Sequence, residues 1–155
     1  AEQLKTVHED KNILVIPTRS LPEGFAALLA YNPDSELSES VKSMQGAVKN
    51  VKTGEITRAV KDTSIKGLAI KKDDIIALYD SNIINTFIDT PTAVLDLIDA
   101  MMEEDDGIIS LFYGQDITAD EAQALEKRLK EKHEDIDIEI HSGGQPHYYY
   151  IISVE

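Results

Sequence analysis

Residues 107–155 constrain the fold more strongly than any other part of the sequence. An apolar run, GIISLFYG, is followed by the helical pattern TADEAQALEKRLKEKH and then by two alternating segments, IDIEIHS and HYYYIISVE. A continuous apolar run is typical of a strand covered on both faces, and strict alternation is typical of a half-buried strand. The order predicts a β-α-β-β unit with a right-handed parallel crossover and an antiparallel last strand.

Within this unit the spacing of single residues predicts finer features. Thr118 and Glu121 have the spacing of a capping box, and Glu126 and Lys130 form an i,i+4 pair. Alternation predicts that one face of the last strand carries Tyr148, Tyr150, Ile152 and Val154. The same alternation turns Tyr149 to the opposite face, where an aromatic ring with a hydroxyl suits a partner surface as well as simple packing.

The first part of the chain mixes helical and strand patterns. AEQLKTVHED resembles the end of a helix, and NILVIP is typical of a strand buried on both faces. A capping box at Ser20 and Glu23 opens a helix that Asn32-Pro33 ends. A second helix is predicted over SELSESVKSMQGAVKN, with one apolar face formed by Leu37, Val41, Met44 and Val48.

Residues 51–87 have the pattern of short antiparallel strands, separated by turns at Gly54, Gly67, KKDD and DSN. Thr90-Pro91 then opens a helix whose apolar stripe is formed by Val94, Leu97, Ile98 and Met101. We therefore expect an α/β protein with mixed parallel and antiparallel sheets and helices packed on them. The pattern divides it near residue 89 into an N-terminal lobe with β hairpins, 1–89, and a C-terminal β-α-β-β lobe, 90–155.

The charge of the chain limits its partners. A net charge of −14 repels nucleic-acid phosphates and anionic membrane surfaces, so we expect neither nucleic-acid binding nor membrane insertion. A cationic patch on a protein partner suits it better. The absence of cysteine excludes disulfides and thiolate chemistry and fits a cytoplasmic protein. Because the chain starts at Ala1 without Met, we expect it to be a piece of a longer protein.

No motif in the chain predicts catalysis. It contains no G-x-x-x-x-G-K-[ST], no G-x-G-x-x-G and no G-x-S-x-G. His141 and His147 flank the SGGQP turn, and EEDD at 103–106 could hold Mg²⁺, but solvated side chains are the simpler interpretation of both. We expect no catalytic and no metal-ligating residues. The GG pair itself predicts a turn that needs positive φ.

The segment TGEITRAVKDT supplies a binding candidate. Arg58 lies between apolar residues on one strand face, which indicates either a paired or snorkelling side chain or an anion contact. Lys61, His147 and Tyr149 complete the set of candidate partner-binding residues.

Three stretches resemble a known family: NILVIPTRSLPEGFAALLAYNP, NVKTGEITRAVKDTSIKGLAIKKDD, and LFYGQDIT together with GGQPHYYYIISVE. They are similar to the C-terminal region of the bacterial fatty acid kinase catalytic subunit, FakA, of the dihydroxyacetone kinase family. The resemblance covers essentially the whole chain. It implies a DegV-like two-lobe fold. The family commonly has arginine where this chain has Lys61, so a bidentate contact there would be lost.

The resemblance also implies a function. In the family, ATP and Mg²⁺ bind to an N-terminal kinase domain, and the C-terminal region engages a FakB-type fatty-acid-binding protein. The bound fatty acid is phosphorylated to acyl-phosphate for phospholipid synthesis. We therefore expect a noncatalytic docking domain without a cofactor of its own, whose partners are the FakB-type protein and the kinase domain of the same parent chain. A homodimer, an independent phosphatase or small-molecule (glycerone-type) kinase, and an acyl-ligand-sensing module remain alternatives.

Overall fold

The computed structural model describes residues 13–65 and 67–155. The chain divides into two compact units, Ala1–Val51 and Lys52–Glu155, and each is described by itself. The helix end expected at residues 1–10 lies outside the described residues. No helix of the described part of the chain is long and apolar enough to cross a membrane.

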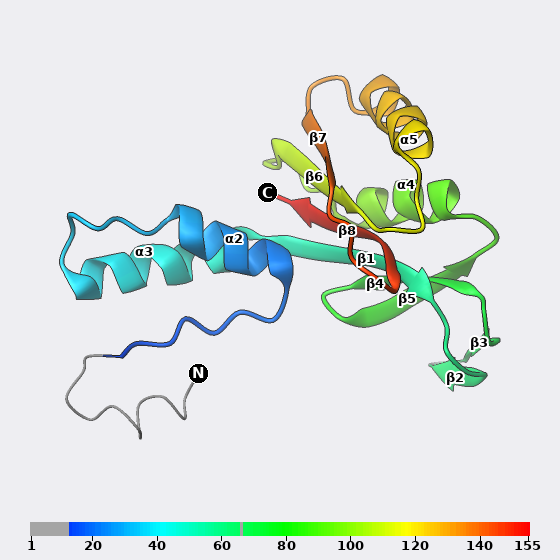
Figure 1. Ribbon diagram of the computed structural model, residues 1–155, viewed down its shortest axis with the longest axis horizontal. Helices are drawn as coiled ribbons and strands as arrows, with labels where there is room; N and C mark the ends of the chain where they lie inside the picture. Colours follow the sequence, from blue (N-terminus) through cyan, green and yellow to red (C-terminus); the bar gives the residue numbers. More distant parts are fainter. Residues whose placement is uncertain (1–12, 66) are drawn as a thin grey trace. The chain divides into compact units, whose positions relative to one another are not determined.

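The described part of the first unit, residues 13–51, contains two helices, α2 (Leu21–Leu29) and α3 (Leu37–Asn50), which pack against each other (Figure 1). The Ser20 hydroxyl accepts a hydrogen bond from the Glu23 backbone N–H at 3.2 Å, and proline occupies the first turn. This confirms the helix start predicted from the sequence. The second predicted helix is confirmed as well.

The strand predicted at NILVIP is wrong for its described part. Residues 13–17 belong to no helix or strand, and Leu14 is 51% exposed. Their side chains instead line a hollow of about 370 Å³ together with residues of α3 such as Val41 and Met44. An apolar run can be covered by helices as well as by neighbouring strands, and composition alone does not distinguish the two.

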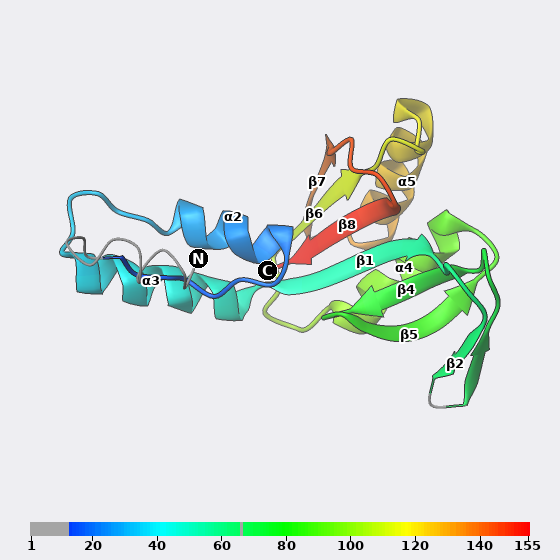
Figure 2. The ribbon, with the colours of Figure 1, turned by 60° about the horizontal axis from the view of Figure 1, so that its bottom comes forward.

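The second unit is built on a six-stranded sheet of order β5-β4-β1-β8-β6-β7 (Figures 1 and 2). Its strands are β1 (Lys52–Arg58), β4 (Ile75–Tyr79), β5 (Asn82–Phe87), β6 (Ile108–Tyr113), β7 (Asp137–Ser142) and β8 (Tyr148–Val154). β6 and β7 run parallel and are linked by α5 (Ala119–Lys132), whereas the other neighbours are antiparallel. A separate ribbon pairs β2 (Thr63–Ile65) with β3 (Leu68–Ile70). The mixed sheet and the β-α-β-β order are confirmed.

The division expected near residue 89 differs from the division after Val51. Residue 89 precedes α4 (Thr90–Met101), and strands from both sides of it share one sheet. β8 pairs with β1 over a register that includes Ile56 opposite Tyr150. This long-range pairing joins the two expected lobes, and no local pattern encodes it.

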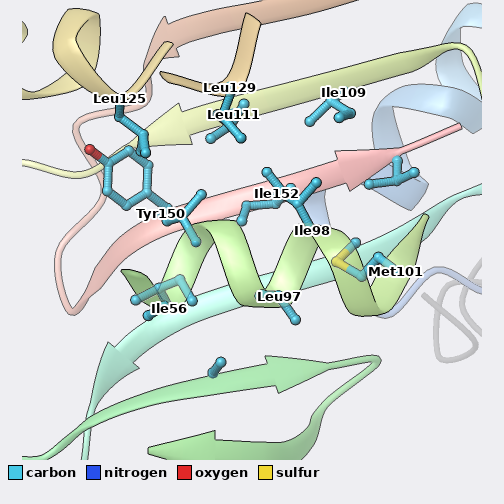
Figure 3. Close-up of a cluster of buried hydrophobic side chains, with 14 of the residues drawn as sticks. Ile56, Leu97, Ile98, Met101, Ile109, Leu111, Leu125, Leu129, Tyr150 and Ile152 are labelled. Atoms are coloured by element: carbon cyan, nitrogen blue, oxygen red, sulfur yellow. The ribbon is translucent and has the colours of Figure 1, made fainter. Parts of the chain in front are cut away.

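The core of the second unit lies between the sheet and the helices α4 and α5 (Figure 3). The stripe predicted for α4 is confirmed, since Val94, Leu97, Ile98 and Met101 are each at most 1% exposed. Leu125 and Leu129 of α5 meet Tyr150 and Ile152 of β8 in the same cluster. Burial, followed by Glu121 and Tyr113, raises the pKa of Tyr150 to about 12.

Gly54 lies inside β1 and not at a turn, which corrects the sequence-based interpretation. A Cβ at this position would lie 2.7 Å from Met101 Sδ and 2.9 Å from Leu97 Cδ2. A side chain at this position would have to displace Met101 and Leu97, because these side chains of α4 pack directly on the backbone of β1.

Candidate functional site

A polar hollow of about 670 Å³ opens where β1 ends and β8 begins. Its lining residues come from four segments of the second unit: Thr57, Arg58, Ala59, Val60, Lys72, Asp73, Gln115, Asp116, His147 and Tyr149. Three of the four candidate residues, Arg58, His147 and Tyr149, thus come together here. Lys61 is exposed and lies outside the lining of the hollow.

A shift in strand register puts Tyr149 in this place. Ile56 pairs with Tyr150 and Thr57 with Tyr148, so the backbone of Tyr149 is left out of the strand pairing between β1 and β8. Such irregularities re-aim a side chain, and they are frequent next to functional sites. The Thr57 hydroxyl donates a hydrogen bond to the His147 carbonyl at 2.6 Å, which fixes the strand end.

Arg58 and Tyr149 form the central contact of the hollow. Arg58 Nε donates to the Tyr149 hydroxyl at 2.9 Å, and Nη2 donates to the same oxygen. The guanidinium carbon lies 5.8 Å from the centroid of the Tyr149 ring, within the range of a cation–π contact. The hydrogen bond and charge interaction with Tyr149, and then Asp73 and Asp116, raise the pKa of Arg58, so its charge is permanent. The predicted pairing of Arg58 is therefore with an aromatic hydroxyl.

The loop that carries His147 is held firmly on the end of β6. Gly114 N donates to the Tyr149 carbonyl at 2.9 Å, and Gln115 N donates to the Gln145 carbonyl at 3.1 Å. A Cβ on Gly114 would lie 2.1 Å from the Tyr148 carbonyl oxygen, so this position requires glycine. Gly144 has a φ of 63°, as expected for the GG turn, and His147 itself has a φ of 72°.

The remaining charged groups of the hollow were not predicted from the sequence. Asp73 Oδ1 lies 3.9 Å from Arg58 Nη1, and Lys72 and Asp116 line the same hollow. KKDD had the pattern of a plain turn, and GQD followed a strand without any motif. Only the tertiary fold brings these two segments beside the end of β1.

The other histidine and acidic candidates lie elsewhere. His141 Nε2 is 3.1 Å from Glu139 Oε2, and its ring stacks on Phe112. Within residues 13–65 and 67–155 no group of three or more His, Asp or Glu side chains is arranged to hold a metal ion.

The acidic run at 103–106 has a structural contact. Lys52 Nζ lies 2.9 Å from Glu103 Oε2 and 2.8 Å from Asp106 Oδ2. Burial alone would lower the pKa of Lys52, but the hydrogen bonds to Asp106 and Glu103 and the negative charges of these two residues together raise it. These two carboxylates therefore neutralise a half-buried cation.

The fold and the hollow together describe an α/β domain with a mixed sheet and a polar hollow at the end of β1. Residues 1–155 match the family of FakA-like fatty acid kinase C-terminal domains, and the chain belongs to that family.

Curated relatives extend beyond this region. Protein YloV of Bacillus subtilis (strain 168) is 42% identical over 146 residues, which cover 94% of this chain and 26% of that protein. An uncharacterized protein of Staphylococcus aureus (strain USA300) is 39% identical over 94% of this chain and 27% of its own length. The chain thus spans about a quarter of the length of these relatives.

A solved structure shares the fold. It is a DegV-family protein from Ruminococcus gnavus, described with vaccenic acid. The TM-score is 0.53 at 11% identity, and the match covers 86% of this chain and 55% of the other. The expected DegV-like α/β fold is confirmed.

Proposed function

We propose that this chain is the noncatalytic C-terminal domain of a fatty acid kinase, which binds an acyl-carrying FakB-type partner. In this role it presents the partner's fatty acid to the ATP-binding kinase domain. The observation that carries the proposal is the match of the whole chain to the family of FakA-like C-terminal domains. The shared DegV-like fold supports it.

The polar hollow is the surface that suits docking best. Arginine and tyrosine are enriched among the residues that dominate binding energy at protein interfaces. Arg58 and Tyr149 hold each other, so less side-chain freedom is lost when a partner binds. The net charge of −14 would speed the encounter with a partner that carries a cationic patch.

The remainder of the reaction belongs to other parts of the assembly. ATP and Mg²⁺ bind to the kinase domain of the parent chain, and the acyl-phosphate formed there enters phospholipid synthesis in the cytoplasm. The isolated chain is therefore expected to hydrolyse neither ATP nor phosphoesters. Turnover by the purified chain alone would instead support an independent phosphatase or kinase.

Calorimetry with an acyl-loaded FakB-type protein tests the docking role. We expect saturable binding, which Tyr149→Ala weakens by about 1–2 kcal/mol because it removes an aromatic anchor. The control is Ile88→Ala, which truncates an apolar side chain that is 98% exposed and lies outside the lining of both hollows, and it should leave affinity unchanged. Absence of binding by the unaltered chain would refute the proposal, and equal losses in both variants would move the docking surface away from the hollow.

A second function, acyl-ligand sensing, is favoured by the apolar hollow of the first unit. Its wall is formed mainly by apolar side chains: Ile13, Leu14, Ile16, Tyr31, Leu37, Val41 and Met44. Apolar hollows with few polar groups suit hydrocarbon ligands. Native mass spectrometry of the purified chain would reveal a co-purified lipid if this function holds.

A further inference from the structure

Arg58 keeps hydrogen-bond donors that the described residues do not use. Of its five N–H groups, one on Nε and one on Nη2 are directed to the Tyr149 hydroxyl. Nη1 lies 3.9 Å from Asp73 Oδ1, which is beyond hydrogen-bond distance. The Arg58 side chain is 57% exposed at the wall of the hollow, so these donors are accessible from it.

The hollow differs in charge from the rest of the chain. Arg58 and Lys72 are balanced by Asp73 and Asp116, while the chain as a whole carries −14. The charged residues that line the hollow therefore present no net negative charge to a singly charged anion. A dianion would leave a larger uncompensated charge beside the two aspartates.

The geometry of the donors further limits which kind of anion the hollow can bind. A guanidinium presents N–H groups in a planar fork, which matches the two oxygens of a carboxylate. Tyr149 restrains this fork from one side through a hydrogen bond and a ring contact. The bond from Thr57 to the His147 carbonyl and the bond from Gly114 to the Tyr149 carbonyl hold the neighbouring wall. The donors are thus positioned before a ligand arrives.

We propose that the Arg58 hollow is a carboxylate-binding pocket, in which the unused Arg58 donors bind a single carboxylate group. The carboxylate is either an acidic side chain of the docking partner or the head group of a free fatty acid. The identity of the partner rests on the function proposed above, whereas the pocket chemistry does not.

The first experiment titrates the 155-residue chain with sodium acetate at constant ionic strength and follows amide and Arg58 Nε–H signals by NMR. Because acetate has few atoms, we expect saturable shifts with a Kd in roughly the millimolar range. Arg58→Gln should weaken acetate binding about tenfold or more, and Arg58→Lys should weaken it less because the charge remains but the fork is lost. Arg128→Gln, the same change at an exposed position of α5, should bind acetate like the unaltered chain.

NMR shifts that do not saturate with acetate would refute the carboxylate pocket. Equal shifts in the Arg58→Gln and Arg128→Gln variants would refute it as well. Dispersed spectra and unchanged melting of each variant establish that the fold is intact. Should Arg58→Gln not fold, Arg58→Lys and Tyr149→Phe carry the test, since the second variant removes only the hydroxyl that restrains the fork.

Two further arms identify the source of the carboxylate. If a partner side chain fills the pocket, acetate should compete with the FakB-type protein in calorimetry, whereas chloride should not. If a fatty acid fills it, octanoate below its micellar concentration should bind several-fold more tightly than acetate, because its chain adds apolar contact. If the chain binds acetate but not the FakB-type protein, docking is refuted and the carboxylate pocket is supported. If Arg58→Gln still binds the FakB-type protein normally and acetate does not bind the unaltered chain, the carboxylate pocket is refuted, but docking is not.

Discussion

The two units of the chain bury their apolar side chains to very different extents. In the second unit, Leu97, Ile98, Leu111 and Ile152 are fully buried between the sheet and its helices. In the first unit, Leu28 and Leu29 of α2 are 65% and 87% exposed, and the helix buries mainly Pro22, Ala26 and Ala27. Apolar burial scales with stabilisation, so the second unit contains most of the folding free energy. The first unit leaves large apolar side chains exposed to solvent.

The largest effect is expected from a charge in the core of the second unit. Ile138 of β7 is 3% exposed and belongs to the main cluster. Ile138→Asp should cost about 4 kcal/mol or more, because a carboxylate would be buried without a partner. Denaturant unfolding followed by circular dichroism measures this.

Leu29→Asp is the matched change in the first unit, and it should cost less than about 1 kcal/mol. Near-wild-type stability of Ile138→Asp would show that β7 does not face the core. If both variants lost a similar free energy of unfolding, the proposed difference in burial between the two units would be refuted.

Two Gly→Ala substitutions, one in each unit, should change stability in opposite directions. Gly54→Ala should destabilise the second unit by up to about 3 kcal/mol, because its Cβ would overlap Met101 and Leu97. Gly46→Ala in α3 meets no atom within 4 Å and should stabilise that helix by up to about 1 kcal/mol. Thermal melting of both variants tests the pair, and a neutral Gly54→Ala would contradict the close packing of α4 on β1.

A smaller effect should appear at alkaline pH. Folding raises the pKa of Tyr150 from 10.0 to about 12 through burial, so the folded state keeps the proton that the unfolded state releases. The resulting stability, roughly 3 kcal/mol, is present below pH 10 and is lost as the pH rises through 12.

Unfolding of the chain and of Tyr150→Phe at about pH 9 and about pH 11 measures this loss, which the variant should reduce. Some pH dependence should persist, because burial and then Asp80 also raise the pKa of Tyr79. An unchanged profile in Tyr150→Phe would contradict the assignment.

Local signals in the sequence predicted the elements well because their causes are local. Ser20 and Thr118 accept the backbone hydrogen bonds that their spacing predicts. Alternation also placed Tyr150, Ile152 and Val154 in the core correctly. Tyr148 lies beyond the register shift and is 36% exposed, so alternation failed for this residue.

The candidate site was only partly predictable. The sequence pointed to three residues: Arg58 between apolar strand residues, His147 beside the SGGQP turn and Tyr149 on the opposite face of the last strand. All three line the hollow. Lys72 and Asp116 gave no signal, because their role depends on which segments the sheet brings to the end of β1. Pairing between β1 and β8 decides this, and it depends on the whole unit.

The interior place of β8 has a consequence for biosynthesis. β1 and β6 emerge from the ribosome well before residues 148–154, and both need β8 as their shared neighbour. Until then the nascent chain exposes two bare strand edges beside an incomplete core, a state prone to aggregation. Chaperone protection would therefore matter most in the interval before β8 has emerged from the ribosome and paired with β1 and β6.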